Sequence, residues 1–309
     1  MIKPTCFIIC FLFLLDVQCQ MLVNDSVNLV VTLNNSHADT ASIHKAFEKV
    51  SSRIHCSDKK ASIKTLDRQL QLKVSASSDT LLMRYLILSK GTFRIVETYD
   101  NFEIYPSFEK VNEVIVKNNY YVDTSKTATS ITRQYPLFAL LVPATTEKGS
   151  LKIGACVGYA KTNDTARLMH LLHLPDIKAS LPAGVRFYWT KQDIKGWFSL
   201  IATKEQNNLA TMTNSMINIV KITQNETNKK LEVFIYFKKE FHQTWADMTC
   251  DNISKSLAIM IDNKVYSYPV VQNEIRTGGA IIMGNWKREE LEAITCILKY
   301  PYDVELDIK

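Results

Sequence analysis

The spacing of apolar residues changes several times between residues 27 and 97, and each spacing predicts one element of secondary structure. Apolar runs and period-two alternation predict strands, whereas apolar residues three or four positions apart predict helices. The predicted strands cover 27–33, 61–66, 70–74 and 92–97, and the predicted helices cover 43–54 and 81–88. The resulting order is the ferredoxin-like βαββαβ arrangement.

Residues that favour helix ends flank both of these predicted helices. Asp39 or Thr40 would cap the first helix, because a side-chain oxygen at that position accepts a hydrogen bond from a free backbone N–H group. Asp79 stands at the equivalent place before the second helix, and Gly91 stops that helix. The end signals and the apolar spacing therefore agree over this segment.

Beyond residue 98 the pattern predicts helices and strands in a less regular order. A short helix is expected over 108–116 in a polar segment, one begins at 163–165, and another covers 238–249. The predicted strands cover 137–142, 153–159, 185–190, 197–203, 217–222, 231–237, 257–261, 265–271 and 303–308. The fold class is therefore α+β, with a ferredoxin-like βαββαβ unit followed by mixed α/β subdomains with antiparallel sheets.

Two local signals stand out in the last third of the chain. The sequence Asp262-Asn263-Lys264 is typical of a tight turn between two strands. A last helix is expected after Asn285, which would cap it, with Glu289 and Glu290 in its first turns.

Residues 1–19 have the pattern of an export signal. Lys3 supplies the positive start, and an unbroken apolar stretch of ten residues covers 6–15. This stretch is shorter than the roughly 20 residues that span a bilayer. We expect cleavage after Cys19, so that the mature chain is exported, as a periplasmic, secreted or envelope-associated protein without an integral membrane span. Two alternatives stay open, a lipoprotein with lipid on Cys19 and an uncleaved anchor.

The predicted organisation has five parts. The signal peptide is followed by the ferredoxin-like base, then a linker with a short helix, a middle α+β segment and a head-like α+β segment. Their ranges are 1–19, 20–99, 100–134, 135–205 and 212–309.

Composition and charge exclude several classes of protein. The chain has 309 residues, of which 46% are apolar and 22% are charged, so it is not disordered, collagen-like or of low complexity. Its net charge of +6 comes from 37 basic and 31 acidic residues, which is too balanced to indicate binding to nucleic acid.

Four of the seven cysteines follow the signal segment. They are Cys56, Cys156, Cys250 and Cys296. In an oxidising compartment an even number permits two disulfides with three possible pairings, and four buried free thiols are the alternative. Their wide spacing contains no CxxC motif, so a zinc site is not indicated.

Two long stretches near the C-terminus resemble a known family. Residues 256–271, which read SLAIMIDNKVYSYPVV, are similar to the LAIVLDGKVYSAPVI stretch of the protein-export subunit SecD, and residues 274–286 resemble the glycine-rich stretch that follows it. The spacing over 241–253 is also similar, and residues 163–190 resemble the first periplasmic domain of fused SecDF. The resemblance covers about 27–309 and implies the base and head of that domain.

The chain departs from the family in two places. Asn263 replaces the turn glycine, and asparagine is the next best residue for a positive φ. After Leu298 the sequence Lys299-Tyr300-Pro301-Tyr302 stands where the family leads into its membrane helices. The family's proton-driven work resides in charged residues of those helices, so this chain alone is not expected to couple to a proton gradient.

No short motif for catalysis, a cofactor or a metal is present. His170 and His173 share one face of a predicted helix, but no third metal ligand is identifiable. The His55-Cys56 pair is adjacent along the chain, an arrangement that does not usually bring two side chains face to face. Gly278-Gly279 lacks the spacing of a phosphate-binding loop. We therefore predict no catalytic residue, no metal and no cofactor.

The aromatic residues are the best candidates for a binding site. Trp245, Tyr266 and Tyr268 would contribute to an apolar groove for unfolded polypeptide, with core packing as the alternative. The same choice applies to Tyr188, Trp189, Trp197 and Phe198. Tyr266 and Tyr268 are two apart on a predicted strand and should share a face, opposite Val265 and Ser267.

The resemblance implies a non-catalytic module that assists protein export. Its partners would be unfolded or translocating polypeptide or the SecYEG–SecDF machinery. An enzyme or effector that reuses the scaffold, with a site near His170, and a degenerate copy without a present role are the alternatives.

Overall fold

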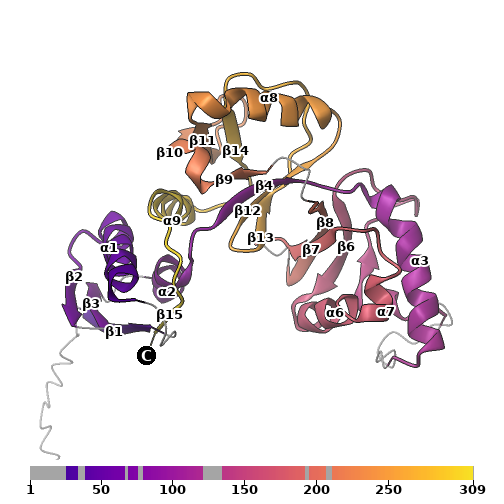
Figure 1. Cartoon of the computed structure of the whole chain (residues 1–309), viewed down its shortest axis with the longest axis horizontal. Coiled ribbons are helices and arrows are strands. Elements are labelled where there is room, and N and C mark those ends of the chain that lie inside the picture. The colour runs from indigo at the N-terminus through magenta and orange to yellow at the C-terminus, as the bar shows by residue number, and fades with distance from the viewer. Residues whose placement is uncertain are drawn as a thin grey trace, which may run out of the picture.

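The computed structural model describes residues 26–33, 39–66, 69–75, 79–120, 134–191, 195–206 and 211–308. The predicted signal segment, including Cys19, lies outside these ranges. The described elements form three lobes around a narrow centre (Figure 1). The class is α+β with antiparallel sheets, which confirms the predicted fold class.

The base lobe contains a four-stranded antiparallel sheet with two helices packed on it (Figure 1). The strand order is β15-β1-β3-β2, the order of a ferredoxin-like sheet. Its elements are β1 (Ser26–Leu33), α1 (Thr40–Ser57), β2 (Ser62–Leu66), β3 (Gln69–Ser75), α2 (Thr80–Leu88) and β15 (Leu306–Ile308). The predicted caps form, since Asp39 accepts from Ser42 N at 2.8 Å and Asp79 from Leu81 N at 2.8 Å.

The fourth strand of the base sheet differs from the prediction. The strand expected over 92–97 forms as β4 (Phe93–Glu97), but it pairs with β12 and β9 in another sheet. Its place beside β1 is taken by β15, the predicted C-terminal strand. Phe93 and Ile95 pack into one core and Val96 into another, so both faces of β4 are covered. An edge strand of a sheet with one wet face has no such surroundings.

The middle lobe carries a four-stranded sheet in the order β5-β6-β8-β7, beside a long helix (Figure 1). Its elements are α3 (Asn101–Lys117), α5 (Leu137–Leu140), β5 (Val142–Pro143), β6 (Cys156–Lys161), α6 (Thr165–Leu172), α7 (Pro175–Lys178), β7 (Val185–Trp189) and β8 (Trp197–Lys204). The predicted strand over 137–142 is mostly the helix α5. Leu137 N donates to Asn112 Oδ1 on α3 at 2.8 Å, a contact that a short apolar run does not reveal.

The head lobe combines two small sheets. One has the order β10-β11-β14, and α8 packs over it (Figure 1). The other has the order β13-β12-β4-β9 and lies at the centre of the molecule. The elements are β9 (Met212–Thr213), β10 (Ile217–Gln224), β11 (Leu231–Phe237), α8 (His242–Asp251), β12 (Leu257–Ile261), β13 (Lys264–Ser267), β14 (Gly279–Ile282) and α9 (Arg288–Lys299).

The predicted turn joins β12 to β13. Asp262 and Asn263 both have positive φ angles, 49° and 61°, as a hairpin of this kind requires. The last helix, α9, has its N-cap at Lys287 rather than at Asn285, because Glu290 reaches back to Lys287 N at 2.8 Å. Glu289 and Glu290 lie in its first turn, as predicted.

Base and head share one continuous apolar core. Ile54 and Leu86 of the base, Ile294 of α9 and Trp245 of the head all belong to it. Arg53 on α1 lies fully buried within this region and donates hydrogen bonds to backbone carbonyls that follow α2 and α9. The base is therefore held to the end of the chain by packing and by one buried cation.

Candidate functional site

Trp245 lies on α8 with its ring turned into the head. Only 3% of its surface is exposed, and its ring packs against Phe237 with the centroids 5.4 Å apart. The indole N–H donates to Gly279 O on β14 at 3.1 Å. Trp245 is therefore part of the core, and it also forms the floor of a surface pocket described below.

Tyr266 and Tyr268 do not share a face, contrary to the prediction. Tyr266 packs into the core common to base and head, whereas Tyr268 packs with Val265 against a separate small cluster. The cause is an irregularity in the β12–β13 ladder, where Ile259 pairs with Ser267 but Met260 pairs with Val265. The register passes over Tyr266, so β13 has one extra residue there, and the strict alternation of side chains on which the prediction depends is interrupted.

A pocket in the head, here called the apolar pocket, opens beside β14. Its volume is about 320 Å³. Most of its lining is apolar side chain, from α8, β12, β14 and the segment 269–275. Trp245, Ile259, Val270, Ile275 and Met283 contribute to it. Val270 and Met283 are 46% and 45% exposed, which is high for side chains of this kind.

A second pocket, here called the aromatic pocket, adjoins the apolar pocket. Its volume is about 890 Å³, and Tyr266, Tyr268 and Trp286 line it. The rings of Tyr266 and Trp286 stack with centroids 5.5 Å apart. Pro269 and Met283 line both pockets, so the two are continuous. Together they form what we call the head groove, and it brings together all three residues predicted from the sequence.

The head groove runs along a sheet edge. Within the described residues β14 has one neighbouring strand, β11. Its residues Gly279, Ala280 and Ile281 line the apolar pocket, as does Met283, which directly follows the strand. An edge strand presents backbone N–H and C=O groups that can pair with an added strand. The groove thus combines apolar surface with main-chain hydrogen-bonding groups.

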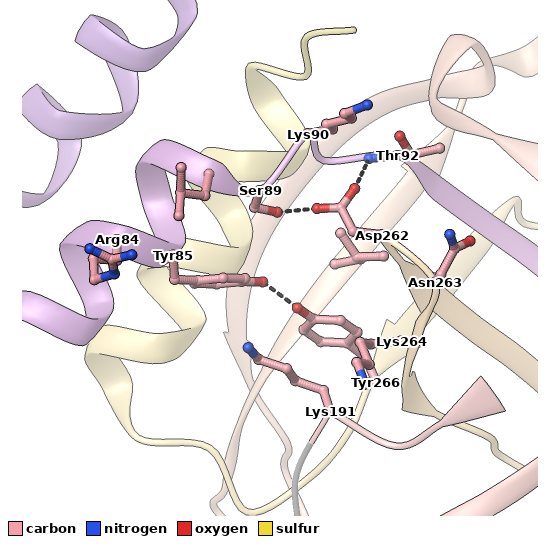
Figure 2. A pocket seen from close by; sticks show the side chains of 12 residues that line it. Arg84, Tyr85, Ser89, Lys90, Thr92, Lys191, Asp262, Asn263, Lys264 and Tyr266 are labelled. Carbon is pink, nitrogen blue, oxygen red and sulfur yellow. Dashed lines mark hydrogen bonds between the residues drawn. The ribbon is translucent and has the colours of Figure 1, made fainter. Parts of the chain in front are cut away.

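A third pocket, here called the basic pocket, lies where base, middle and head lobes meet. Figure 2 shows Tyr85 of α2 pointing at Tyr266, and the two hydroxyl groups are hydrogen-bonded. Lys191 lies over the Tyr85 ring, with its ammonium 4.3 Å from the centroid. Burial raises the pKa of Tyr85 and of Tyr266, so both hydroxyl groups stay neutral at physiological pH.

Asp262 ties the β12–β13 hairpin to the end of α2. Its carboxylate accepts hydrogen bonds from the Ser89 hydroxyl and from Thr92 N at 2.8 Å (Figure 2). It also accepts one from Gly91 N at 3.1 Å. All of these donors lie in the short connection between α2 and β4. The hairpin and the connection are therefore fixed relative to each other, which positions Tyr266 in the groove.

The other candidates from the sequence do not converge. His170 and His173 are exposed near the end of α6, and His173 Nδ1 lies 2.6 Å from Met169 O. His55 Nδ1 lies 2.9 Å from Ser51 O, in its own helix. In the described ranges no three histidine, cysteine, aspartate or glutamate side chains are grouped as metal ligands would be. Of the further aromatic candidates, Trp189 is buried in the middle-lobe core.

Several residues of the site are not among the binding residues predicted from the sequence. Met283, Tyr85, Lys191 and Lys264 come from four separate segments and meet only through the fold. Of these, Met283 and Lys264 lie in the two stretches that carry the family resemblance, and Tyr85 and Lys191 do not. No helix among the described residues has both the length and the hydropathy needed to cross a membrane.

The fold defines a class of protein, an α+β protein built from small antiparallel sheets. Residues 200–300 match the family model described as SecDF, P1 head subdomain. The chain is therefore similar to SecD and SecDF, and the similarity to the P1 head subdomain covers residues 200–300.

Individual relatives and a solved structure are also similar to this chain. SecD of Rhodothermus marinus is 30% identical over 170 residues, which are 53% of this chain and 26% of that protein. SecDF of Thermus thermophilus is 35% identical over 68 residues, which are 22% of this chain and 9% of that protein. A crystal structure of SecDF in a super-membrane-facing form covers 92% of this chain and 29% of its own, with a TM-score of 0.50 and 14% identity.

The likeness to that solved structure extends to the fold alone. The chain spans about a quarter of the length of the Rhodothermus relative and less of the Thermus one. The match to the family model lies mostly in the head, which is also the lobe that carries the groove.

Proposed function

We propose that this protein is an exported, non-catalytic module of protein export that holds extended, unfolded polypeptide in the head groove. The observation that carries the proposal is the groove itself, in which exposed apolar side chains lie along the edge of β14 that has no partner strand among the described residues. An extended chain could add to β14 through main-chain hydrogen bonds, which require no particular client sequence. Apolar client side chains would then enter the two pockets.

The family relationship supports the same function. The relatives are named as subunits of a protein translocase, so a role in export is the natural one for their periplasmic domain. A periplasmic or envelope location and docking on the SecYEG–SecDF machinery belong to the proposal. Binding in this groove needs no bound cofactor or metal and no chemical step.

Met283→Asp tests the proposal. Met283 lies where the two pockets join, and a carboxylate there would have to be desolvated by an apolar client. We expect the affinity for a labelled, reduced and permanently unfolded polypeptide, followed by fluorescence anisotropy, to fall at least about tenfold.

Ile153→Asp is the matched control. Ile153 is 84% exposed in a loop of the middle lobe and lines neither pocket, so this variant should bind like the parent. Equal affinities for all three proteins, or no binding by the parent, would refute the proposed function. Circular dichroism of both variants would show that neither substitution has unfolded the chain.

A further inference from the structure

The head groove ends in a patch of positive charge. Tyr266 and Lys191 line both the aromatic pocket and the basic pocket, so the basic pocket continues the groove. The continuous surface therefore runs from an apolar end at Trp245, past the stacked rings of Tyr266 and Trp286, to a basic end at Lys191 and Lys264.

Three cations of the basic pocket form no ion pair within the described part of the chain. Lys90 is paired with Glu305, at 3.4 Å, but no ion pair is formed there by Arg84, Lys191 or Lys264. The one carboxylate of the pocket, that of Asp262, is directed at its hydroxyl and backbone donors (Figure 2).

Lys191 and Lys264 both lie in partly desolvated surroundings. The pKa of Lys191 is lowered by partial desolvation and by the charge of Lys264, while Glu290 and Asp262 act in the opposite direction, and the pKa of Lys264 is lowered by partial desolvation. An anion placed between them would offset both effects, because an opposite charge favours the ammonium form. The pocket has a volume of about 670 Å³, which is ample for a carboxylate side chain.

From this charge complementarity we infer that the groove selects polypeptides with acidic residues next to an apolar segment, and that the basic pocket binds their carboxylates. This inference rests on the proposed function and adds a substrate class to it. The client lies with its apolar side chains in the head groove and its Asp or Glu side chains between Lys191 and Lys264, with Arg84 at the rim.

Two labelled peptides that differ only in charge test the preference. Both carry the same extended apolar segment, followed in one by two aspartates and in the other by two asparagines. The aspartate peptide should bind about three- to tenfold more tightly at low salt, since each exposed ion pair contributes modestly. The difference should shrink at high salt.

Substitution of the two lysines completes the test. The double variant Lys191→Gln, Lys264→Gln should lose the preference while binding the asparagine peptide as before, and Lys148→Gln, an exposed site on the middle lobe, should change neither affinity. Equal affinities of the parent for both peptides would overturn the preference alone. Failure of the parent to bind either peptide would overturn the proposed function as well.

An independent set of contacts concerns Cys56 and Cys296. The helices α1 and α9 run past each other in opposite directions. Lys49 lies over the Tyr300 ring at 5.9 Å, and Arg53, one turn later, donates to Tyr300 O at 2.9 Å and to Ile297 O at 3.4 Å. A surface hollow is then shared by Ser57 and Asp58 at the end of α1 and by Glu289, Glu290 and Glu292 at the start of α9.

This register places Cys56, in the last turn of α1, opposite Cys296 of α9. Cys56 is exposed and Cys296 is buried. Burial raises the pKa of the Cys296 thiol to about 12, and a hydrogen bond with the Cys56 thiol adds to the effect. Cys156 lies in the middle lobe and Cys250 on α8, so neither is on these two helices.

We propose that Cys56 and Cys296 form a disulfide in the oxidising compartment to which the chain is exported. The exposed Cys56 thiolate attacks a disulfide of an oxidising oxidoreductase, or oxidised glutathione, and one thiol leaves. The Cys296 thiolate then displaces the remaining half, so that two electrons and two protons pass to the oxidant. The bond fastens α1 to the helix that leads into β15, the closing strand of the base.

Peptide mapping after oxidation with glutathione tests the pairing. Under denaturing alkylation the peptides that contain Cys56 and Cys296 should be found joined, and reduction should lower the melting temperature by about 5–10 °C. Cys296→Ser should abolish that shift and Cys250→Ser should retain it. Complete alkylation of Cys56 and Cys296, or a link from either one to Cys156 or Cys250, would overturn the assignment.

Discussion

Replacement of Arg53 by methionine is expected to lower the free energy of unfolding by about 3–5 kcal/mol, a large share of the total for a protein of this kind. The guanidinium is fully buried. It donates to the carbonyl oxygens of Leu86, Ser89, Lys90, Ile297 and Tyr300. Methionine fills similar volume but leaves these acceptors without their donor, and a buried carbonyl without a partner is costly.

The same side chain joins parts of the base that are far apart in sequence. Its guanidinium lies 4.7 Å from the ring centroid of Tyr302, whose hydroxyl donates to Ile87 O. Desolvation lowers the pKa of Arg53, although Asp262 and the tyrosines around it act in the opposite direction. The substitution therefore weakens the attachment of α1, α2 and the C-terminal segment at once.

Chemical denaturation measures this effect. Lys45→Met, at an exposed position of the same helix, is the control and should change the stability by less than about 0.5 kcal/mol. If Arg53→Met proved as stable as this control, the buried cation would contribute nothing to closing the base around β15. An equal loss of stability in both variants would indicate that any substitution in α1 destabilises the helix, whatever the role of Arg53.

Trp245→Ala is expected to cost a similar amount, about 3–5 kcal/mol, and to remove polypeptide binding. The indole packs on Phe237 and floors the apolar pocket, so its loss leaves a cavity between α8 and the β11–β14 sheet. Trp245→Phe keeps most of the apolar contact but loses the hydrogen bond to Gly279 O, which should cost about 1 kcal/mol.

Both variants should be compared by urea denaturation and by titration with the unfolded polypeptide. We expect Trp245→Phe to bind within a few-fold of the parent and Trp245→Ala not to bind measurably. Full binding by a folded Trp245→Ala protein would show that the pocket floor has no part in holding the client.

Much of the local structure follows from the sequence alone. Asp39 and Asp79 cap helices as their position predicts, and the Asp262-Asn263 turn has the φ angles that its residues favour. These features depend on a few neighbouring residues. The family resemblance of residues 256–286 likewise depends on a short stretch of sequence, and this stretch lies within the family-model match over residues 200–300.

The errors arise where distant residues decide the outcome. The edge position of the base sheet is occupied by β15 because β4 pairs with β12 and β9, which lie more than a hundred residues away, and is covered on both faces there. Most of the run over 137–142 is a helix because Leu137 N donates to Asn112 Oδ1 and because Leu137 and Leu140 pack into the core of the middle lobe. Tyr268 turned away from Tyr266 because of the irregularity opposite Met260. A single sequence contains no local sign of any of these.

The candidate site also contains some residues that the sequence predicts and others that only the tertiary structure brings there. Trp245, Tyr266 and Tyr268 were predicted as aromatic residues in a segment with a known relative, and they do line one continuous groove. The lysines at its basic end come from the middle lobe and from the hairpin turn, and only the tertiary structure places them beside Tyr85.

Hydrogen exchange with and without a bound client tests the central claim most directly. The account predicts that an unfolded polypeptide slows exchange of the backbone amides of β14 and of residues 269–275, with little change in the loop around Ile153. Protection confined to the middle lobe or to the base sheet, with β14 unchanged, would contradict it.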